Sequence, residues 1–229
     1  MYSLDDRRVK VPKNFDISKA RKAQQLIASK TIEVDELPRQ LTYIAGADAA
    51  FRKGRVIGAI VVLRYRDWKA AEESSVVLKE RFPYIPTLLS FREAPVIFAA
   101  FSKLKVKPQL MFIDGQGLAH PYRCGLATHI GVVLDLPTIG VAKKRLWGEE
   151  GALEGNRAPL IDPRDGKVIG AAVWTKKGSR PVYVSIGHKI SLETAVRLVL
   201  EATLPGKRLP EPILAAHALA SKMAKEVAE

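Results

Sequence analysis

The chain has 229 residues, of which 47% are hydrophobic and 27% are charged. These proportions are typical of a globular protein with a sizeable core, and they argue against a disordered chain. Lys and Arg outnumber Asp and Glu by 37 to 24, which gives a net charge of +13 and favours a polyanionic partner such as nucleic acid. A basic protein without such a partner is the alternative.

Cysteine usage and hydropathy indicate the compartment and the solubility of the protein. Cys124 is the only cysteine, so neither an intrachain disulfide nor a cysteine-rich zinc site can form. This fits a reducing cytoplasm, where we expect a monomer. The first ten residues lack the apolar core of a signal peptide, and the longest apolar run, Val56–Leu63, is too short to span a bilayer. With no repeat or linker, we expect one soluble domain over residues 1–229.

A helix and three strands are predicted in the first part of the chain. Asp16 can cap a helix over Phe15–Lys30. Four residues form the predicted apolar side of this helix: Ile17, Ala20, Leu26 and Ile27. Two apolar strands follow over Leu41–Phe51 and Arg55–Tyr65, joined by a short, glycine-containing hairpin link. A third strand is predicted over Ser74–Glu80.

Helices and strands alternate in the rest of the chain. Helical patterns cover Phe91–Leu104, Leu126–Leu134, Leu192–Ala202 and Pro212–Glu229. Strand patterns cover Gln109–Ile113, Thr138–Ala142, Val168–Thr175 and Val182–Ile186. A meander followed by this alternation predicts an α/β fold, in which helices pack on a mixed central sheet.

Two aspartates stand beside apolar strand sequences. Asp48 lies within Tyr43–Phe51, and Asp114 directly follows Leu110–Ile113. We expect both at or near strand ends, and because the parallel part of such a sheet places its active site at the carboxyl ends of its strands, this position favours a functional role. Burying a carboxylate is costly unless it is paired or binds a metal ion. The alternatives are a solvated or arginine-paired Asp48 and an ordinary Asp-Gly turn at Asp114.

Glu93, His120 and His217 are further candidates. Glu93 falls in the first turns of a predicted helix, where its role could be limited to favouring the helix dipole. A lone histidine is more often structural than a ligand. Carboxylates with a histidine suit Mg²⁺ or Mn²⁺, which hold phosphates and activate water. These residues indicate a metal-dependent nuclease, although their spacing does not show that the acids converge.

Several sequence blocks resemble the endonuclease V family over nearly the whole chain. They are Gly46–Asp48, Pro83–Pro86 with Phe91–Pro95, Asp114–Pro121 with Cys124–Ala127, and Gly140–Leu146 with Ser185–Ser191 further on. In this order and spacing the match is specific. The resemblance implies a ribonuclease H-like fold. It also implies hydrolysis of the second phosphodiester on the 3′ side of deoxyinosine, leaving 3′-hydroxyl and 5′-phosphate ends.

The same resemblance assigns roles to individual residues. Asp48, Glu93 and Asp114 match the metal-binding and catalytic carboxylates, with Mg²⁺ as the metal and Mn²⁺ as a substitute. His217 matches a position where the family has a further His or Asp near the metal. His120 and Lys143 match polar residues near the scissile phosphate, where Lys143 could stabilise developing charge. The ordinary alternative for Lys143 is a solvated surface lysine.

A wedge and a base pocket are also implied. The wedge, which would fill the gap left by a rotated base, matches Pro83, Tyr84, Ile85 and Pro86. A proline-bounded turn with a packed tyrosine is the alternative. The pocket for the extruded base matches Thr87, Gly115, Gly125, Leu126 and Leu146.

Two residues depart from the family pattern. Thr87 stands where many members have glycine, which puts strict hypoxanthine preference in question. Tyr122 stands where a second arginine is common, so one phosphate contact would be missing.

Three functions are consistent with these patterns. The first is a Mg²⁺-dependent endonuclease that acts on deoxyinosine in DNA, in the service of repair. The second is the same enzyme with inosine-containing RNA or a broader set of structures as substrate, since contacts to the 2′-hydroxyl leave no short motif. The third is a basic nucleic-acid-binding protein without activity. The gathered acids disfavour it, because like charges collect only at a cost without a metal.

Overall fold

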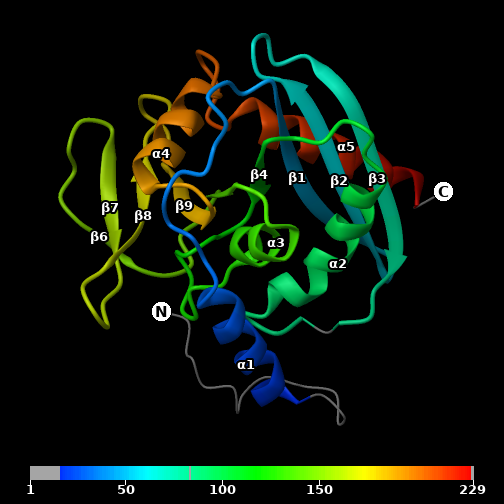
Figure 1. Ribbon diagram of the computed structural model, residues 1–229, viewed down its shortest axis with the longest axis horizontal. Helices are drawn as coiled ribbons and strands as arrows, with labels where there is room; N and C mark the ends of the chain where they lie inside the picture. The colour runs from blue at the N-terminus through cyan, green and yellow to red at the C-terminus, as the bar shows by residue number, and fades with distance from the viewer. Residues whose placement is uncertain (1–15, 83, 228–229) are drawn as a thin grey trace.

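A nine-stranded sheet forms the centre of the protein (Figure 1). The computed structural model describes residues 16–82 and 84–227, so Phe15, Pro83 and the last two residues of the predicted final helix lie outside the described part. The strands in chain order are β1 (Tyr43–Arg52), β2 (Arg55–Arg64), β3 (Ala70–Lys79), β4 (Leu110–Asp114), β5 (Thr138–Ala142), β6 (Glu149–Glu150), β7 (Arg157–Ile161), β8 (Val168–Val173) and β9 (Val182–His188). The sheet is open, with the order β3-β2-β1-β4-β5-β9-β8-β7-β6.

The first five strands include the two that carry Asp48 and Asp114. β1, β2 and β3 form an antiparallel meander, and β1, β4 and β5 are parallel neighbours. The register pairs Ala47 with Ile113, so Asp48 and Asp114 lie at the same level of adjacent strands. Strands β9, β8, β7 and β6 continue the sheet in antiparallel fashion. The expected α/β fold with a mixed, ribonuclease H-like sheet is confirmed.

Helices cover both faces of this sheet. In chain order they are α1 (Ile17–Ala28), α2 (Leu89–Ser102), α3 (Leu126–Leu134), α4 (Leu192–Glu201) and α5 (Glu211–Glu226). Ala45 of β1 belongs to the apolar cluster with α2 and α3, whereas Ile44 belongs to the cluster with α4 and α5. Adjacent strand residues point to opposite faces. The sheet is therefore buried between two layers of helices.

Close packing of α5 on β1 depends on Gly46. A Cβ atom at this position would lie 1.8 Å from the carbonyl oxygen of Pro212, in the first turn of α5. Asp48 is two residues further along β1 and points to the same face as Gly46. The close approach therefore brings His217 of α5 over Asp48, where the two side chains meet.

The packing of α1 differs from its predicted pattern. Asp16 caps the helix as expected. Ala20 is buried as predicted, but Leu26 is 59% exposed, whereas Arg21 and Gln24 are buried, so the predicted apolar side is only partly correct. The physical reason is that both buried polar side chains donate hydrogen bonds to the carbonyl oxygen of Thr87. Their burial is thereby compensated.

Two further expectations need correction. β6 and β7 were not predicted, because β6 has two residues and β7 contains Pro159, which is rarely found inside strands. Asp48 was expected at or near a strand end, but β1 continues to Arg52 through its pairing with β2. Asp114 does end β4, as expected. Within the described residues, every helix is too short or too polar to cross a membrane.

Candidate active site

Asp48, Asp114 and His217 converge from β1, the end of β4 and α5. The Nδ1 atom of His217 lies 2.8 Å from the Oδ2 atom of Asp48. The other Asp48 oxygen accepts the N–H of Ala49 at 2.8 Å. One ligand atom from each of the three residues lies within 4.8 Å of the other two. This spacing would let one cation contact all three side chains.

Glu93 adds a third carboxylate from α2, and its side chain is almost fully buried. Burial, followed by the charges of Asp48 and Asp114, raises its pKa to about 8. Like charges in a poorly solvated site favour the neutral acid. Glu93 is outside the group of atoms within 4.8 Å, so it flanks the cluster of the other three residues.

Lys143 partly neutralises the acids. It follows β5 directly, and its Nζ atom donates a hydrogen bond to Oδ2 of Asp114. Burial, then the charge of Asp48, raises the pKa of Asp114, while Lys143 opposes this rise. The pKa shifts of Glu93 and Asp114 together indicate that the described residues supply too little positive charge for three ionised acids.

A divalent cation fits this donor set. The carboxylate oxygens and the imidazole nitrogen are hard ligands, which suit Mg²⁺ or Mn²⁺ more than soft metals. A cation among them would also favour ionised Glu93 and Asp114, because a nearby positive charge lowers the pKa of an acid. The residues that could hold it are Asp48, Asp114 and His217, with Glu93 beside them.

A pocket of about 590 Å³, counted to its open mouth, adjoins the acids and has Glu93 in its wall. All five residues predicted for the base pocket line this cavity: Thr87, Gly115, Gly125, Leu126 and Leu146. Tyr84, Ile85, Pro86 and His120 also line it. The structure therefore brings the sequence-predicted pocket residues into one cavity next to the candidate metal ligands.

Thr87 adopts a backbone conformation that favours glycine. Its φ angle is +67°, in the left-handed region where a β-branched side chain is strained. The Thr87 carbonyl oxygen accepts hydrogen bonds from Gln24 at 2.7 Å and from Arg21 at 3.3 Å. The ring of His120 also bonds this backbone. These contacts hold threonine in a conformation that glycine would adopt freely.

His120 is buried in the pocket wall, where its ring bonds two backbone segments. Nδ1 accepts the N–H of Tyr122 at 3.1 Å, and the ring also bonds the Thr87 backbone. Burial, with a further effect from the charge of Arg21, lowers its pKa to about 3. His120 is therefore uncharged near neutral pH. In this state it can shape the pocket but adds no positive charge near a phosphate.

The predicted wedge presents one side chain outward. Tyr84 is 60% exposed, whereas Ile85 is 1% exposed and packs with Leu88 and Ala20. The guanidinium of Arg92 lies 5.9 Å from the centre of the Tyr84 ring. Tyr84 could therefore enter a helix stack, while Ile85 anchors the segment.

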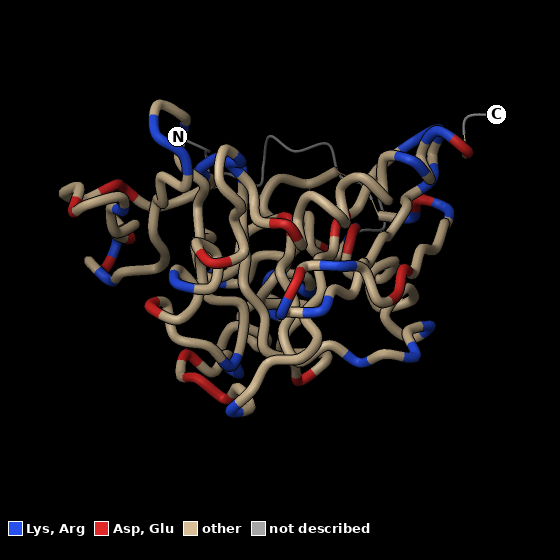
Figure 2. Tube along the Cα trace, turned by 90° about the horizontal axis from the view of Figure 1, so that it is seen from above, with Lys and Arg blue, Asp and Glu red and all other residues tan. Residues whose placement is uncertain are grey.

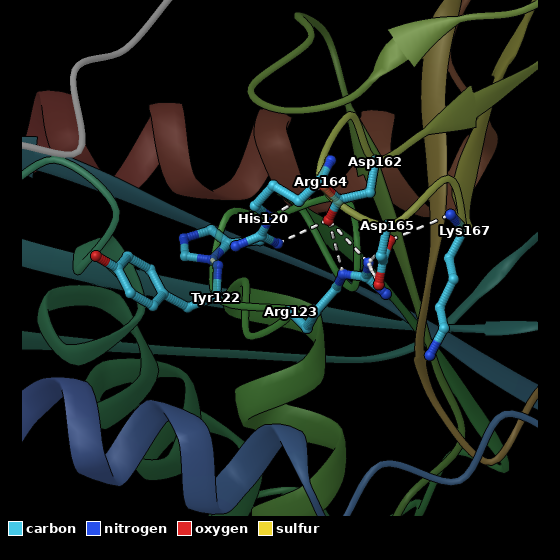
Figure 3. Close-up of polar contacts among 7 residues, drawn as sticks. All are labelled: His120, Tyr122, Arg123, Asp162, Arg164, Asp165 and Lys167. Carbon is cyan, nitrogen blue, oxygen red and sulfur yellow. Dashed lines mark hydrogen bonds and ion pairs between the residues drawn. The ribbon is translucent and has the colours of Figure 1, made fainter.

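The buried side chain of Asp162 holds the loop that contains Arg123, beside the pocket (Figure 3). Asp162, fully buried just after β7, accepts hydrogen bonds from Arg123 at 2.8 Å and from Arg164 at 2.7 Å. The hydrogen bonds from Arg164 are the largest cause that holds the pKa of Asp162 well below its usual range. Arg123 has a φ of +51° and directly precedes Cys124 and Gly125, which line the pocket. Asp162 thus fixes one wall of the cavity from a distant part of the sheet.

Sequence reasoning missed Gln24, Gln116 and Asp162. The Nε2 atom of Gln116 donates to the Lys144 carbonyl at 3.0 Å, which ties two loops of the site together. Its Oε1 atom is buried and makes no hydrogen bond to the described residues. The place of Gln116 between two glycines after Asp114 could have flagged it. Gln24 and Asp162 lie in segments without any such local signal.

Comparisons with known proteins agree with this geometry. The model of the Endonuclease V family matches residues 25–218. Endonuclease V of Thermofilum pendens is 44% identical over 216 residues, covering 94% of this chain and 92% of its own. The crystal structure of Endonuclease V from Streptomyces avermitilis has a TM-score of 0.84 at 36% identity, covering 96% of this chain and 98% of that one. Endonuclease V of Ciona intestinalis, in complex with a 24mer DNA containing an inosine followed by a ribo-adenosine, has a TM-score of 0.83 at 30% identity, covering 92% and 98%.

The fold and the acid cluster define a nuclease, an enzyme that hydrolyses phosphodiesters. The resemblance of the sequence blocks is confirmed by the family match over most of the chain and by the full-length structural similarity. The chain belongs to the endonuclease V family.

Proposed function

We propose that this protein is a Mg²⁺-dependent endonuclease that recognises deoxyinosine in DNA and hydrolyses the second phosphodiester on its 3′ side, which would start the repair of deaminated adenine. The observation that carries the proposal is the cavity that shares Glu93 with the acid cluster. An extruded base in this cavity would lie next to the candidate metal ligands. The inosine-containing DNA bound to the Ciona intestinalis relative supports a deaminated purine as the base.

The residues of the site have distinct roles in this proposal. Asp48, Asp114 and His217 would hold the cation, with Glu93 at its side. When bound, Mg²⁺ supplies positive charge to the phosphate and makes a bound water more acidic. Lys143, released from Asp114 by the cation, would face the negative charge that develops on the phosphate.

Base extrusion and base reading would use the pocket side of the site. Tyr84, which is exposed at the pocket rim, would fill the space left in the helix stack. Hypoxanthine carries an N1–H donor that adenine lacks. The buried Oε1 atom of Gln116, which has no partner among the described residues, could accept this hydrogen after a small side-chain rotation. Leaving a buried acceptor unpaired is costly, so adenine would be disfavoured.

The Asp114→Ala variant tests this assignment. It should bind a labelled duplex with one deoxyinosine but lose cleavage by about a thousandfold or more, because a ligand and the partner of Lys143 are both removed. Asp67→Ala removes an exposed acid in the β2–β3 turn and serves as the matched control. Full cleavage by Asp114→Ala would refute the role of the acid cluster.

Inosine-containing RNA is the alternative substrate. Matched DNA and RNA strands, each with one inosine and a different label, can compete in one reaction. We expect the DNA to be cut first. Preferential cutting of the RNA would assign the enzyme to RNA and leave the catalytic residues unchanged.

A further inference from the structure

Three basic side chains form a row across the far end of the meander. Arg52 at the end of β1 is the register partner of Arg55 at the start of β2, and Arg55 is the partner of Lys79 at the end of β3. All three residues are exposed. We call them the basic row. Lys and Arg lie mainly around the periphery of the trace (Figure 2), but this row places three of them on neighbouring strands in direct register.

The row works against the stability of the sheet. Like charges directly opposite each other on neighbouring strands are destabilising, and the row contains two such pairs. No ion pair joins Arg52, Arg55 or Lys79 to another side chain in the described part of the protein. The nearest acid in sequence, Glu80, is already engaged by the guanidinium of Arg92. The repulsion is therefore left uncompensated within the described fold.

Protection of the sheet edge does not explain the whole row. β3 is an edge strand, and a lysine on an edge strand discourages pairing with other chains, which accounts for Lys79. Arg52 lies beyond Ala47, the last residue of β1 that pairs with β4, so its only strand neighbour is β2. Arg55 is paired with Arg52 on one side and with Lys79 on the other. Edge protection therefore gives no reason for a positive charge at Arg55, between two others.

The row shares a face of the sheet with the candidate metal ligands. Residues two and four positions apart on a strand point to the same face, so Arg52 lies on the face of Asp48. Phe51, between them in the alternation, points to the opposite face and contacts Arg92 of α2. Four residues separate Asp48 from Arg52, which corresponds to roughly 13 Å along β1. That length is spanned by roughly four nucleotides of a B-form strand.

We propose that the basic row binds the phosphate backbone of the nucleic acid substrate on the Asp48 face, roughly four nucleotides from the scissile bond. The inference rests on the proposed function only in taking nucleic acid as the substrate. Contacts to phosphates are independent of base sequence, so the row would contribute equally to damaged and undamaged DNA. It would position the duplex, while the pocket selects the base.

The triple variant Arg52→Gln/Arg55→Gln/Lys79→Gln tests the proposal. Each lost phosphate contact reduces the slope of log affinity against log salt by about 0.9, so the slope should become shallower by roughly two to three. Affinity for an undamaged duplex at low salt should fall roughly tenfold or more. The melting temperature should equal or exceed that of the wild type, because cross-strand repulsion is removed.

A matched control separates specific contacts from the general effect of net charge. Arg66→Gln/Lys69→Gln/Lys103→Gln also removes three exposed positive charges, at the opposite end of β2 and β3 and at the end of α2. It should change the salt slope by less than one. Equal slopes in the two triple variants would overturn the proposal, as would a basic-row variant that binds like the wild type.

The outcome is independent of whether deoxyinosine is the substrate. If the wild type failed to cut inosine-containing DNA, the proposed function would fail, yet the slope measured on undamaged DNA would still report on the row. A melting temperature far below that of the wild type would show that the row stabilises the fold, and would also contradict the proposal.

Discussion

Replacing Glu93 with glutamine should remove a pH-dependent loss of stability from the metal-free protein. Glu93 is 8% exposed, and burial together with Asp48 and Asp114 raises its pKa from 4.5 to about 8. In the folded protein the side chain therefore keeps its proton near neutral pH, while in the unfolded chain it is ionised. Unfolding releases this proton, so stability falls as the pH rises towards 8.

The size of the effect follows from the pKa shift. Between pH 6.5 and 8 one proton is released on unfolding, which lowers the free energy of unfolding by about 1.4 kcal/mol per pH unit, or roughly 2 kcal/mol in total. The histidines His120, His129 and His188 have lowered pKa values, so they oppose this trend until unfolded histidine has lost its proton, at about pH 7. Their effect is common to the wild type and Glu93→Gln, so the difference between the two proteins isolates Glu93.

Urea unfolding at pH 6.5, 7.25 and 8 in the presence of chelator measures this effect. The wild type should lose roughly 2 kcal/mol more than Glu93→Gln across the window. Excess Mg²⁺ should flatten the wild-type curve, because a bound cation favours the ionised acid. Parallel curves for the two proteins in chelator would refute the buried, protonated Glu93.

Three further substitutions probe the pocket. Gly125→Ala should lower both the melting temperature and inosine cleavage, the latter by about tenfold or more, because the new Cβ would lie 2.2 Å from the Gln116 carbonyl oxygen. Thr87→Gly should raise stability in urea by up to about 1 kcal/mol, since it relieves a φ of +67°. Asp162→Asn should cost about 2 to 3 kcal/mol in the same assay and weaken binding of inosine-containing DNA, because Arg123 loses its charged partner.

The sheet was largely predictable because its strands are local apolar runs. β4 and β5 read directly from Leu110–Ile113 and Thr138–Ala142, and both are buried in the structure. β7 could not be read in this way, since Pro159 argues against a strand and its stability comes from pairing with β8.

The acids of the site could be predicted from the sequence, but the residues and packing that position them could not. An acid within or directly after an apolar strand sequence made Asp48 and Asp114 candidates. Their convergence with His217 depends on the packing of α5 against Gly46. No local sequence pattern predicts this packing. Gln24 contacts the Thr87 backbone 63 positions away in the chain. Polar residues buried by such distant partners look like surface residues in the sequence.

The most direct test of the central claim compares a labelled duplex containing one deoxyinosine with its inosine-free twin, with Mg²⁺ and with chelator. A single Mg²⁺-dependent cut at the second phosphodiester 3′ to the lesion, absent from the twin, is the predicted result. Equal cutting of both duplexes, or cutting that persists in chelator, would contradict a metal-dependent, inosine-specific site built on Asp48, Glu93 and Asp114.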